Sequence, residues 1–300
     1  VRTETAPMID GNIDDEVWTK AKPVDDFLQF EPYNLVPASV RTEVRVMYDD
    51  DNLYIAFKNF DPNPPSVMKR MSRRDDYEVI GEQTDWVGFG LDSNNDDLTG
   101  YWFMLSAAEV QLDVSINETG GWRNMYDPSW DAVWDGKTST HSEGWSAEIR
   151  VPFNVFQFTK DSEQVWGATF QRGYYANQEQ IQWPGRTKGS RGMIPHYGVI
   201  SGIKDIPQPN SLELVPYVLA GQTQSDESNQ EANLGLDLRY NINSSTTLNM
   251  TFNPDFGQVE ADPSVLNLSA FETRLDEKRP FFVQGANFFN SWLNMFNSRR

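Results

Sequence analysis

The chain contains no cysteine, which excludes disulfide bonds, thiolate metal sites and cysteine nucleophiles together. It has only two histidines, His141 and His196, and no metalloprotease frame, serine-nucleophile motif or phosphate-binding loop accompanies either of them. The 44 acidic residues always offer some pair that resembles the two carboxylates of a glycosidase, so such a pair is no evidence of hydrolysis. The sequence therefore favours a protein without covalent catalysis.

Basic residues are also scarce, since 25 lysines and arginines stand against 44 acidic residues and give a formal net charge of -19. Phosphate backbones require clustered lysine and arginine, so we expect no nucleic acid partner. A chain this acidic is a better candidate for binding divalent cations or neutral ligands. No stretch approaches the roughly 20 apolar residues of a membrane helix, so any membrane contact has to come from β-strands. No basic and then apolar leader opens the chain, and we expect that a signal peptide has already been removed.

Alternating apolar and polar residues, interrupted by turns rich in aspartate, asparagine, glycine and proline, dominate the first 205 residues. Such alternation predicts β-strands. The segments concerned are 40–48, 53–57, 86–91, 101–105, 145–151 and 165–172. Turns at 49–52 and 92–97 join the first four segments into two hairpins. Together the segments predict an antiparallel β-sandwich over residues 1–205, with a short helix at 14–21 that Asp14 caps.

Pro207 and Pro209 mark a linker, after which a second domain is expected over residues 206–300. Three segments of this domain again alternate apolar and polar residues, at 212–219, 234–242 and 246–252. The pattern is typical of strands at the start of an outer-membrane β-barrel, and equally of an amphipathic sheet packed on the sandwich. Three strands cannot close a barrel, so the first interpretation makes the chain a truncated piece. The polar stretch 222–232 is expected as a turn in solvent.

The end of the chain has a different character. Segment 263–273 predicts a short helix with Val265, Leu268 and Phe271 on one side. A dense aromatic group follows, made of Phe281, Phe282, Phe288, Phe289, Trp292 and Phe296. These residues are expected either to contribute to a core or to form a plug-like segment beside a barrel mouth.

Several ordered motifs resemble those of one known family. They are IDGNIDDEVW at 9–18, Arg73-Arg74-Asp75, SWDAVW at 129–134, EGWSAEI at 143–149, NPDFGQVEAD at 253–262 and EKRPFF at 277–282. The chain resembles a bacterial outer-membrane family in which a module similar to family 9 carbohydrate-binding domains precedes a β-barrel. The resemblance implies a glycan ligand and a role in carbohydrate catabolism or uptake. It also implies an outer-membrane location, with the sandwich and any partner protein in the periplasm or at the cell surface.

Sugars are bound by stacking on aromatic rings and by hydrogen bonds to planar polar side chains. The resemblance implies two tryptophans that face each other across a slot. The candidate ligand-binding residues are Trp183, Asn177, Glu179 and Gln182 in a polar loop expected at 177–186, Arg172 in the strand before it, and Trp86 and Trp102 on the opposite wall. The alternative for these tryptophans is burial in the core. That role is expected for Trp18, Trp130, Trp134, Trp145 and Trp166.

The acidic turn at 92–97 is the candidate metal site. Asp92, Asn94, Asp96 and Asp97 offer carboxylate and amide oxygens, which are the ligands that calcium prefers. The glycine and the distal glutamate of an EF-hand are absent from their places, so the turn is not of that type. Two interpretations stay open: a structural calcium ion, which the resemblance also implies, and a set of solvated turn residues.

Three functions are open at this level. The first is glycan binding by a non-catalytic sandwich attached to an outer-membrane barrel. The second is a glycoside hydrolase, or an accessory module of one. The third is a structural plug or docking domain of a transport barrel. The ten tryptophans, the family-like motifs and the missing catalytic frames favour the first.

Overall fold

The structure is a computed structural model that describes residues 1–120, 125–128, 130–207, 212–224, 228–243, 246–253 and 282. The chain divides into two units, residues 1–208 and residues 209–300. Some expectations lie outside the described residues: the helix at 263–273, the aromatic group apart from Phe282, and the motif residues 254–262 and 277–281.

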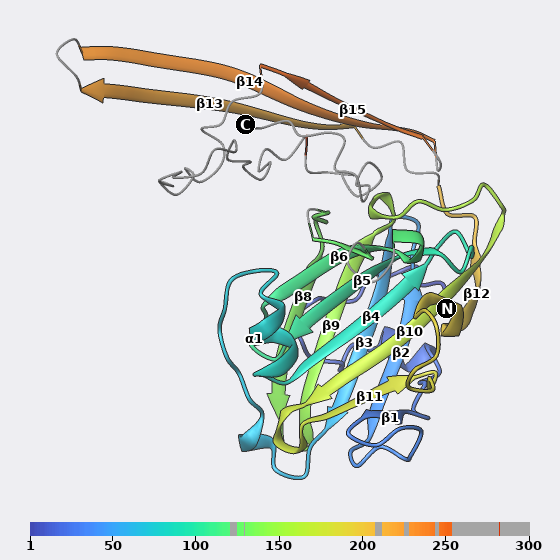
Figure 1. Ribbon diagram of the computed structural model, residues 1–300. Coiled ribbons are helices and arrows are strands. Elements are labelled where there is room, and N and C mark those ends of the chain that lie inside the picture. Colours follow the sequence, from blue (N-terminus) through green and yellow to red (C-terminus); the bar gives the residue numbers. More distant parts are fainter. Residues whose placement is uncertain are drawn as a thin grey trace. The chain divides into compact units, whose positions relative to one another are not determined.

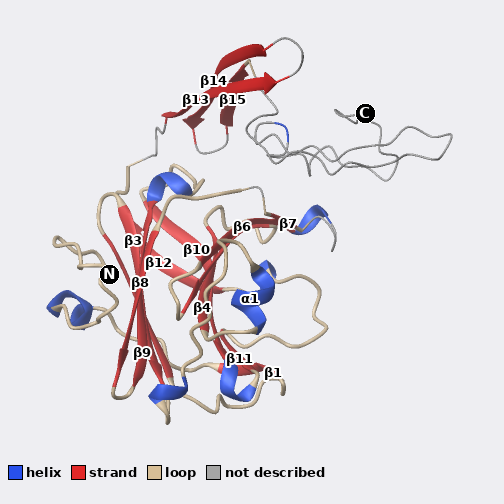
Figure 2. Ribbon diagram, turned by 90° about the vertical axis from the view of Figure 1, so that its left-hand side faces the viewer, coloured by secondary structure: helices blue, strands red, loops and turns tan. Residues whose placement is uncertain are grey.

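Two antiparallel sheets face each other in the first unit (Figure 1, Figure 2). The smaller sheet has the strand order β2 (Thr42–Tyr48), β3 (Asn52–Phe60), β9 (Gly144–Pro152) and β8 (Asp135–His141). The larger sheet has the order β1 (Leu28–Glu31), β11 (Glu179–Trp183), β10 (Glu163–Tyr174), β4 (Trp86–Asp92), β5 (Thr99–Ser106), β6 (Gln111–Asn117) and β7 (Tyr126–Asp127), and β12 (Gly198–Lys204) also pairs with β10. The predicted antiparallel sandwich is confirmed, as are the β2–β3 and β4–β5 hairpins.

The core between the two sheets is rich in aromatic rings. Phe89 and Phe103 stack with their centroids 4.7 Å apart, and Phe103 meets Trp134 edge-on at 5.6 Å. The five tryptophans predicted to be buried are all buried, Trp130, Trp134, Trp145 and Trp166 in this core and Trp18 in a separate cluster on the outer side of the smaller sheet. Because burial of a large apolar side chain contributes roughly 1.5–3 kcal/mol, these rings supply much of the cohesion of the sandwich.

The outer face of the larger sheet carries a second apolar cluster. Alternation along β4 points Phe89 to the core and Trp86 outward, where Ile80 of α1 (Tyr77–Glu82) joins the same cluster. Figure 2 shows α1 on this outer side of the sheet. Asp76 caps α1, since its carboxylate accepts a hydrogen bond from a first-turn amide at 3.2 Å. The helix is thereby fixed over one end of the outer face.

The helix predicted at 14–21 is present in a shorter form, as the 3-10 helix η1 (Glu16–Lys20). The prediction that Asp14 caps it is wrong, because Asp15 holds the N-cap position and makes no capping hydrogen bond. Pro23 follows closely and disfavours helical backbone in the residue before it, which keeps the segment short. The other 3-10 helices are η2 (Pro64–Ser66), η3 (Glu118–Gly120), η4 (Phe153–Val155), η5 (Tyr175–Asn177) and η6 (Ile194–His196). In the part of the chain that the structure describes, no helix combines the length and apolarity needed to cross a membrane.

Long strands form the sheet of the second unit. β13 (Leu212–Gln224) pairs with β14 (Ser228–Asn243) along its whole length, and β14 pairs with β15 (Thr246–Phe252). The solvent turn expected at 222–232 is therefore wrong for most of that stretch, because the hairpin ladder includes 222–224 and 228–232. Backbone hydrogen bonds can extend a ladder without any apolar repeat in the sequence.

The register of this sheet gathers apolar side chains on one face. Leu238 of β14 lies between Leu214 of β13 and Met250 of β15. Exposed apolar residues on the same face are Leu212, Val218, Leu234, Tyr240, Leu248 and Phe252. Polar residues such as Asp237 and Asn249 alternate with them and point the other way. The strands are amphipathic as predicted, while a barrel built on them stays a prediction.

Candidate functional site

The stretch expected as a polar loop at 177–186 contains strand β11, which pairs with β10. Its alternation puts Gln180 and Gln182 on the outer face of the larger sheet, and Glu179 and Trp183 on the core side. The expected loop is therefore wrong at 179–183. Because side chains of a strand alternate between two faces, the candidate residues from this segment are divided between opposite sides of the sheet.

Trp183 does not face the other candidate tryptophans. Its ring packs on the core side against Phe170, with centroids 5.8 Å apart and planes inclined by 25°. Trp86 and Trp102 lie on the outer face in the cluster with α1, and are 3% and 8% exposed. The sheet itself separates the two sides, so these three residues do not form the slot that the resemblance implies.

Arg172 lies in the interior and is fully buried. Its Nη1 donates to the carbonyl oxygen of Arg41 at 3.1 Å and to Thr42 Oγ1 at 3.0 Å, and its Nη2 donates to the carbonyl oxygen of Phe60 at 3.0 Å. Burial lowers the pKa of Arg172 to about 10, and the charges of nearby carboxylates oppose that shift. These bonds join the larger sheet to the smaller one, so Arg172 positions strands and does not face a ligand.

Three other candidate residues make hydrogen bonds within the protein. The buried carboxylate of Glu179 accepts hydrogen bonds from the amide of Ser39 at 2.9 Å and from its hydroxyl. Asn177 is exposed, and its Nδ2 donates to Ser39 Oγ at 3.3 Å. Gln182 is buried, and its Nε2 donates to the carbonyl oxygen of Pro184 at 3.0 Å. Of these residues, only Asn177 presents an exposed side chain.

A pocket of about 190 Å³, here called the α1 pocket, opens on the outer face beside α1. Trp86 and Glu179, two of the predicted site residues, are among those that line it. Other lining residues with aromatic, amide or carboxylate groups are Tyr175, Gln178, Gln180 and Glu82. Tyr174 and Glu179 also border the pocket, but the alternation of β10 and β11 puts their side chains on the core side of the sheet. Drug-sized ligands generally occupy roughly 300 Å³ or more, so this pocket suits one small ring.

The local sequence explains how the α1 pocket is built. The indole Nε1 of Trp86 donates to the carbonyl oxygen of Gly81 in α1 at 3.0 Å, which fixes the ring over the sheet. Gly173 lies beneath that ring and leaves room for it. On the core side of the same strand, the Tyr174 ring has the Arg172 guanidinium 5.4 Å from its centroid. Gln178 takes a left-handed backbone conformation, with φ of 51°, where η5 turns into β11.

The chemistry of the α1 pocket suits a small polar ring. Aromatic faces offer apolar contact, while amide and carboxylate groups offer both donors and acceptors. The sequence reasoning missed Tyr175, Gln178 and Gln180. The alternation from Glu179 to Trp183 was a signal for a strand, and recognising it would have put Gln180 on a different face from Trp183.

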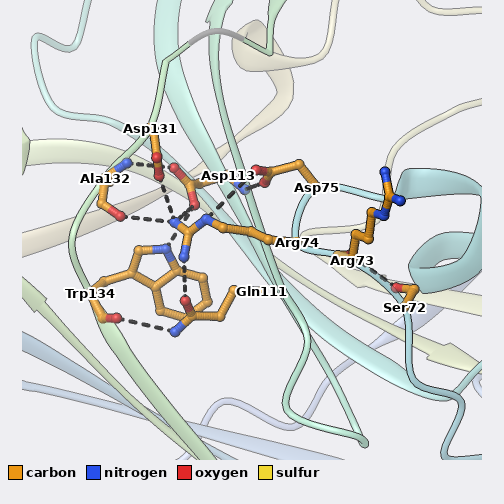
Figure 3. A network of polar contacts seen from close by, with 9 residues as sticks. All are labelled: Ser72, Arg73, Arg74, Asp75, Gln111, Asp113, Asp131, Ala132 and Trp134. Carbon is orange, nitrogen blue, oxygen red and sulfur yellow. Dashed lines mark hydrogen bonds and ion pairs between the residues drawn. The ribbon is translucent and has the colours of Figure 1, made fainter. Parts of the chain in front are cut away.

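The Arg73-Arg74-Asp75 motif organises loops (Figure 3). Arg74 forms ion pairs with Asp113 and, at 2.9 Å, with Asp131, and its Nη2 donates to a backbone carbonyl at 2.9 Å. The buried Asp113 also accepts a hydrogen bond from the Trp134 indole at 3.0 Å. Burial raises the pKa of Asp113, and these donors and the Arg74 charge oppose the rise. The Arg73 side chain points away from this group in Figure 3.

In the acidic turn at 92–97, aspartate carboxylates accept hydrogen bonds from backbone amides of the turn and of the residues that follow it. Asp92 accepts hydrogen bonds from the amides of Asp96 and Asp97 at 3.2 and 2.9 Å. Asp96 in turn accepts from the amides of Leu98 and Thr99 at 2.8 and 2.7 Å. Asn94 lies in the same turn. Within the described ranges, no three histidine or acidic side chains are grouped so that they could hold a metal ion. Calcium stays a prediction.

The first unit is thus an antiparallel β-sandwich that carries a small polar and aromatic pocket on its larger sheet. The chain belongs to the carbohydrate family 9 binding domain-like family, whose model matches residues 9–183, more than half of the chain. Residues 208–300 match a second family, described as a domain of unknown function (DUF5916). No curated protein matches the chain at a significant level.

Two similar solved structures are carbohydrate binding modules of family 9 from Caldicellulosiruptor kristjanssonii. The complex with glucose is 17% identical, covers 70% of this chain and 99% of its own, and has a TM-score of 0.48. The complex with cellotriose is also 17% identical, covers 66% of this chain and 90% of its own, and has a TM-score of 0.46. At these values the family assignment rests on the sequence match.

Proposed function

We propose that the first unit binds a neutral sugar ring in the α1 pocket without covalent catalysis. The observation that carries this proposal is the lining of the α1 pocket in a chain of the carbohydrate family 9 type: Trp86 and Tyr175 supply aromatic rings, and Gln178 and Gln180 supply amides. Sugars need this pairing of apolar faces with planar hydrogen-bonding groups. The outer-membrane role in carbohydrate catabolism or uptake is part of the same proposal.

Calorimetric titration of the full chain with glucose and cellotriose tests the proposal. Tyr175→Ala and Gln180→Ala remove half-buried side chains of the α1 pocket, and we expect each to weaken binding about tenfold, or 1–2 kcal/mol. Trp183→Phe changes a ring on the other side of the sheet and is expected to keep the affinity of the wild type. Circular dichroism confirms that each variant is folded.

The outcomes separate the candidate functions. Loss of binding in Trp183→Phe alone would move the site to the core-side edge of the sheet. Failure of the wild type to bind any sugar of a broad panel, with calcium present, would refute the glycan proposal. Release of reducing ends from a polysaccharide, abolished by a single carboxylate substitution, would favour the glycoside hydrolase instead.

The second unit supports the outer-membrane part of the proposal. Where its three strands pair over 212–218, 234–240 and 248–252, one face is apolar, and Leu214, Leu238 and Met250 follow one another across it. Strands that cross a membrane alternate apolar side chains toward lipid with polar ones toward the lumen. We propose that this face contacts lipid in a larger barrel.

Partitioning of the full chain into vesicles of phosphatidylethanolamine and phosphatidylglycerol tests the lipid contact. Leu238→Asp places a charge on the apolar face and should reduce partitioning several-fold, since a carboxylate that faces lipid is destabilising, by less than the roughly 2–4 kcal/mol of a lysine or arginine. Asn249→Asp places the same charge on the polar face and should leave partitioning unchanged. Equal losses in both variants, or no partitioning of the wild type, would contradict the proposal. A stable partner protein without sugar or lipid affinity would favour the docking role.

A further inference from the structure

A row of polar residues crosses the core side of the smaller sheet near one end of the sandwich. Thr42, Asn59 and Trp145 are direct cross-strand neighbours on β2, β3 and β9. They are 1%, 0% and 0% exposed. Side chains directly opposite each other on one face have Cβ atoms about 4.5–5.5 Å apart, so the row is contiguous.

Arg172 reaches this row from the larger sheet. Its Nη1 donates to Thr42 Oγ1 and its Nη2 to the carbonyl oxygen of Phe60, the residue after Asn59, both at 3.0 Å. Asp61 is only 5% exposed and lies close enough for its charge to act on the pKa of Arg172. Among the described residues no ion pair joins these two side chains. The guanidinium and the carboxylate therefore approach the same buried region without direct contact.

Several buried polar atoms in this region have no hydrogen-bond partner among the described residues. They are Asn59 Oδ1 and Nδ2, Asp61 Oδ2, Trp145 Nε1 and Arg172 Nε. Unpaired buried polar atoms are rare in folded proteins, because each loses its hydrogen bonds to water without replacement. Five such atoms, from two facing sheets and from Asp61 directly after β3, point to a common hydrogen-bonding ligand at one end of the core.

We propose that Asn59, Asp61, Trp145 and Arg172 bind ordered water molecules that bridge the two sheets. The Trp145, Arg172 and Asn59 nitrogens present N–H donors, while the Asn59 and Asp61 oxygens accept. Water serves both kinds of group and makes about three hydrogen bonds when buried. A metal cation is a poorer match, because three of the five atoms are N–H donors. An anion is disfavoured by the carboxylate of Asp61.

The bridging waters would also hold the Tyr174 ring on the core side of β10. Arg172 lies in β10 two residues before Tyr174, and its guanidinium is 5.4 Å from the centroid of that ring. Waters that fix Arg172 Nε therefore help to hold the guanidinium against this ring on the core side of the sheet. The water site itself does not depend on the ligand of the α1 pocket.

Water-to-protein nuclear Overhauser effects at the tryptophan indole protons test the proposal in the full chain labelled with 15N-tryptophan. Trp145 is expected to show a cross-peak from long-lived bound water. Trp166 is the matched control, because it is equally buried and its Nε1 donates to Gln164 Oε1 at 3.2 Å. Absence of a water cross-peak at Trp145, or an equal one at both indoles, would overturn the proposal.

The variant Asn59→Leu supplies an independent test through the sign of its effect. With bridging waters, the apolar side chain displaces them and strands the other polar atoms, so the urea midpoint falls and the Trp145 water cross-peak disappears. In a dry site, replacing two unpaired polar atoms with an apolar side chain of similar size would leave the midpoint unchanged or raise it. Asn177→Leu on the surface is the control and should leave the midpoint unchanged. A midpoint that responds to a metal chelator in the wild type and not in Asn59→Leu would also overturn the proposal, in favour of a cation.

Discussion

The indole nitrogen of Trp86 lies 2.1 Å from the point where a Cβ on Gly173 would stand. No side chain can share that space, so Gly173→Ala must displace the Trp86 ring. That ring is held by the hydrogen bond that its Nε1 donates to the carbonyl oxygen of Gly81 at 3.0 Å. We expect Gly173→Ala to lower the free energy of unfolding by about 1–3 kcal/mol, as overpacking does elsewhere. Urea denaturation of the full chain measures the change.

Gly81→Ala is the control for this prediction. The nearest atoms to its Cβ belong to the exposed Tyr77 ring at 3.2 Å, which can move aside. Alanine is also the better helix former by about 1 kcal/mol, so the variant should be neutral or slightly more stable than the wild type. An equal loss of stability in both glycine variants would contradict the role assigned to the Trp86 contact.

Hairpins were predictable because their residues alternate and their turns carry aspartate and asparagine. β2 to β5 were placed to within a few residues on that basis. β8 was missed because DGKTSTH has no large apolar residue to reveal a period of two, and β11 was missed because the alternation in EQIQW spans only five residues. Glu179 is buried in β11 because the fold supplies Ser39, a distant hydrogen-bond partner that a single sequence does not display. Gln182 is buried too, but its partner is the nearby carbonyl of Pro184.

The prediction of the site was affected by the same missed strand, β11. Once β11 is a strand, its register with β10 decides which side chains share a face, and a shift of one residue reverses every assignment. Trp183 pairs with Phe170 on the core side, whereas Trp86 pairs with Gly173 on the outer side. Residue types alone suggested an aromatic slot. Which tryptophans could face each other in such a slot depended on this long-range register.

The two arginines of the Arg73-Arg74-Asp75 motif should respond differently to substitution. Arg74 pairs with Asp113, whose side chain is 1% exposed, while Arg73 points away from this group. Arg74→Met leaves a buried carboxylate without its cation, and we expect a loss of about 1–3 kcal/mol, reduced from the fully buried case because Arg74 is partly exposed. Arg73→Met should change the free energy of unfolding by less than about 0.5 kcal/mol.

The pH dependence distinguishes this loss from a loss of packing. Burial already raises the pKa of Asp113, and removal of Arg74 raises it further. A carboxyl whose folded pKa lies above its unfolded value stabilises the fold at low pH and loses that contribution as pH rises through the folded pKa. The deficit of Arg74→Met should therefore be larger at pH 7 than at pH 4. A deficit that does not change with pH would show that the arginine acts through its aliphatic stem.

Glu148 is a buried carboxylate whose raised pKa should make the stability of the fold depend on pH. It is fully buried on β9 and accepts hydrogen bonds from the amides of Asp10 and Gly11 at 3.0 and 2.9 Å and from the Trp18 indole at 2.7 Å. These bonds fasten the N-terminal segment to the smaller sheet. Burial raises the pKa of Glu148 from 4.5 to about 7, against the opposing effect of the three donors.

The sign of the effect follows from proton binding. Between pH 4.5 and 7 the folded chain retains a proton on Glu148 that the unfolded chain has lost, so the free energy of unfolding falls as pH rises through this window. The fall is on the order of 3 kcal/mol for this group. Glu148→Gln does not titrate, so its stability relative to the wild type should increase steadily from pH 4.5 to 7 and then level off. Urea denaturation across that range measures the difference, with Glu143→Gln, an exposed carboxylate paired with Lys58 at 2.8 Å, as the control. Parallel stability curves for the wild type and Glu148→Gln would mean that the three donors hold Glu148 ionised throughout this range.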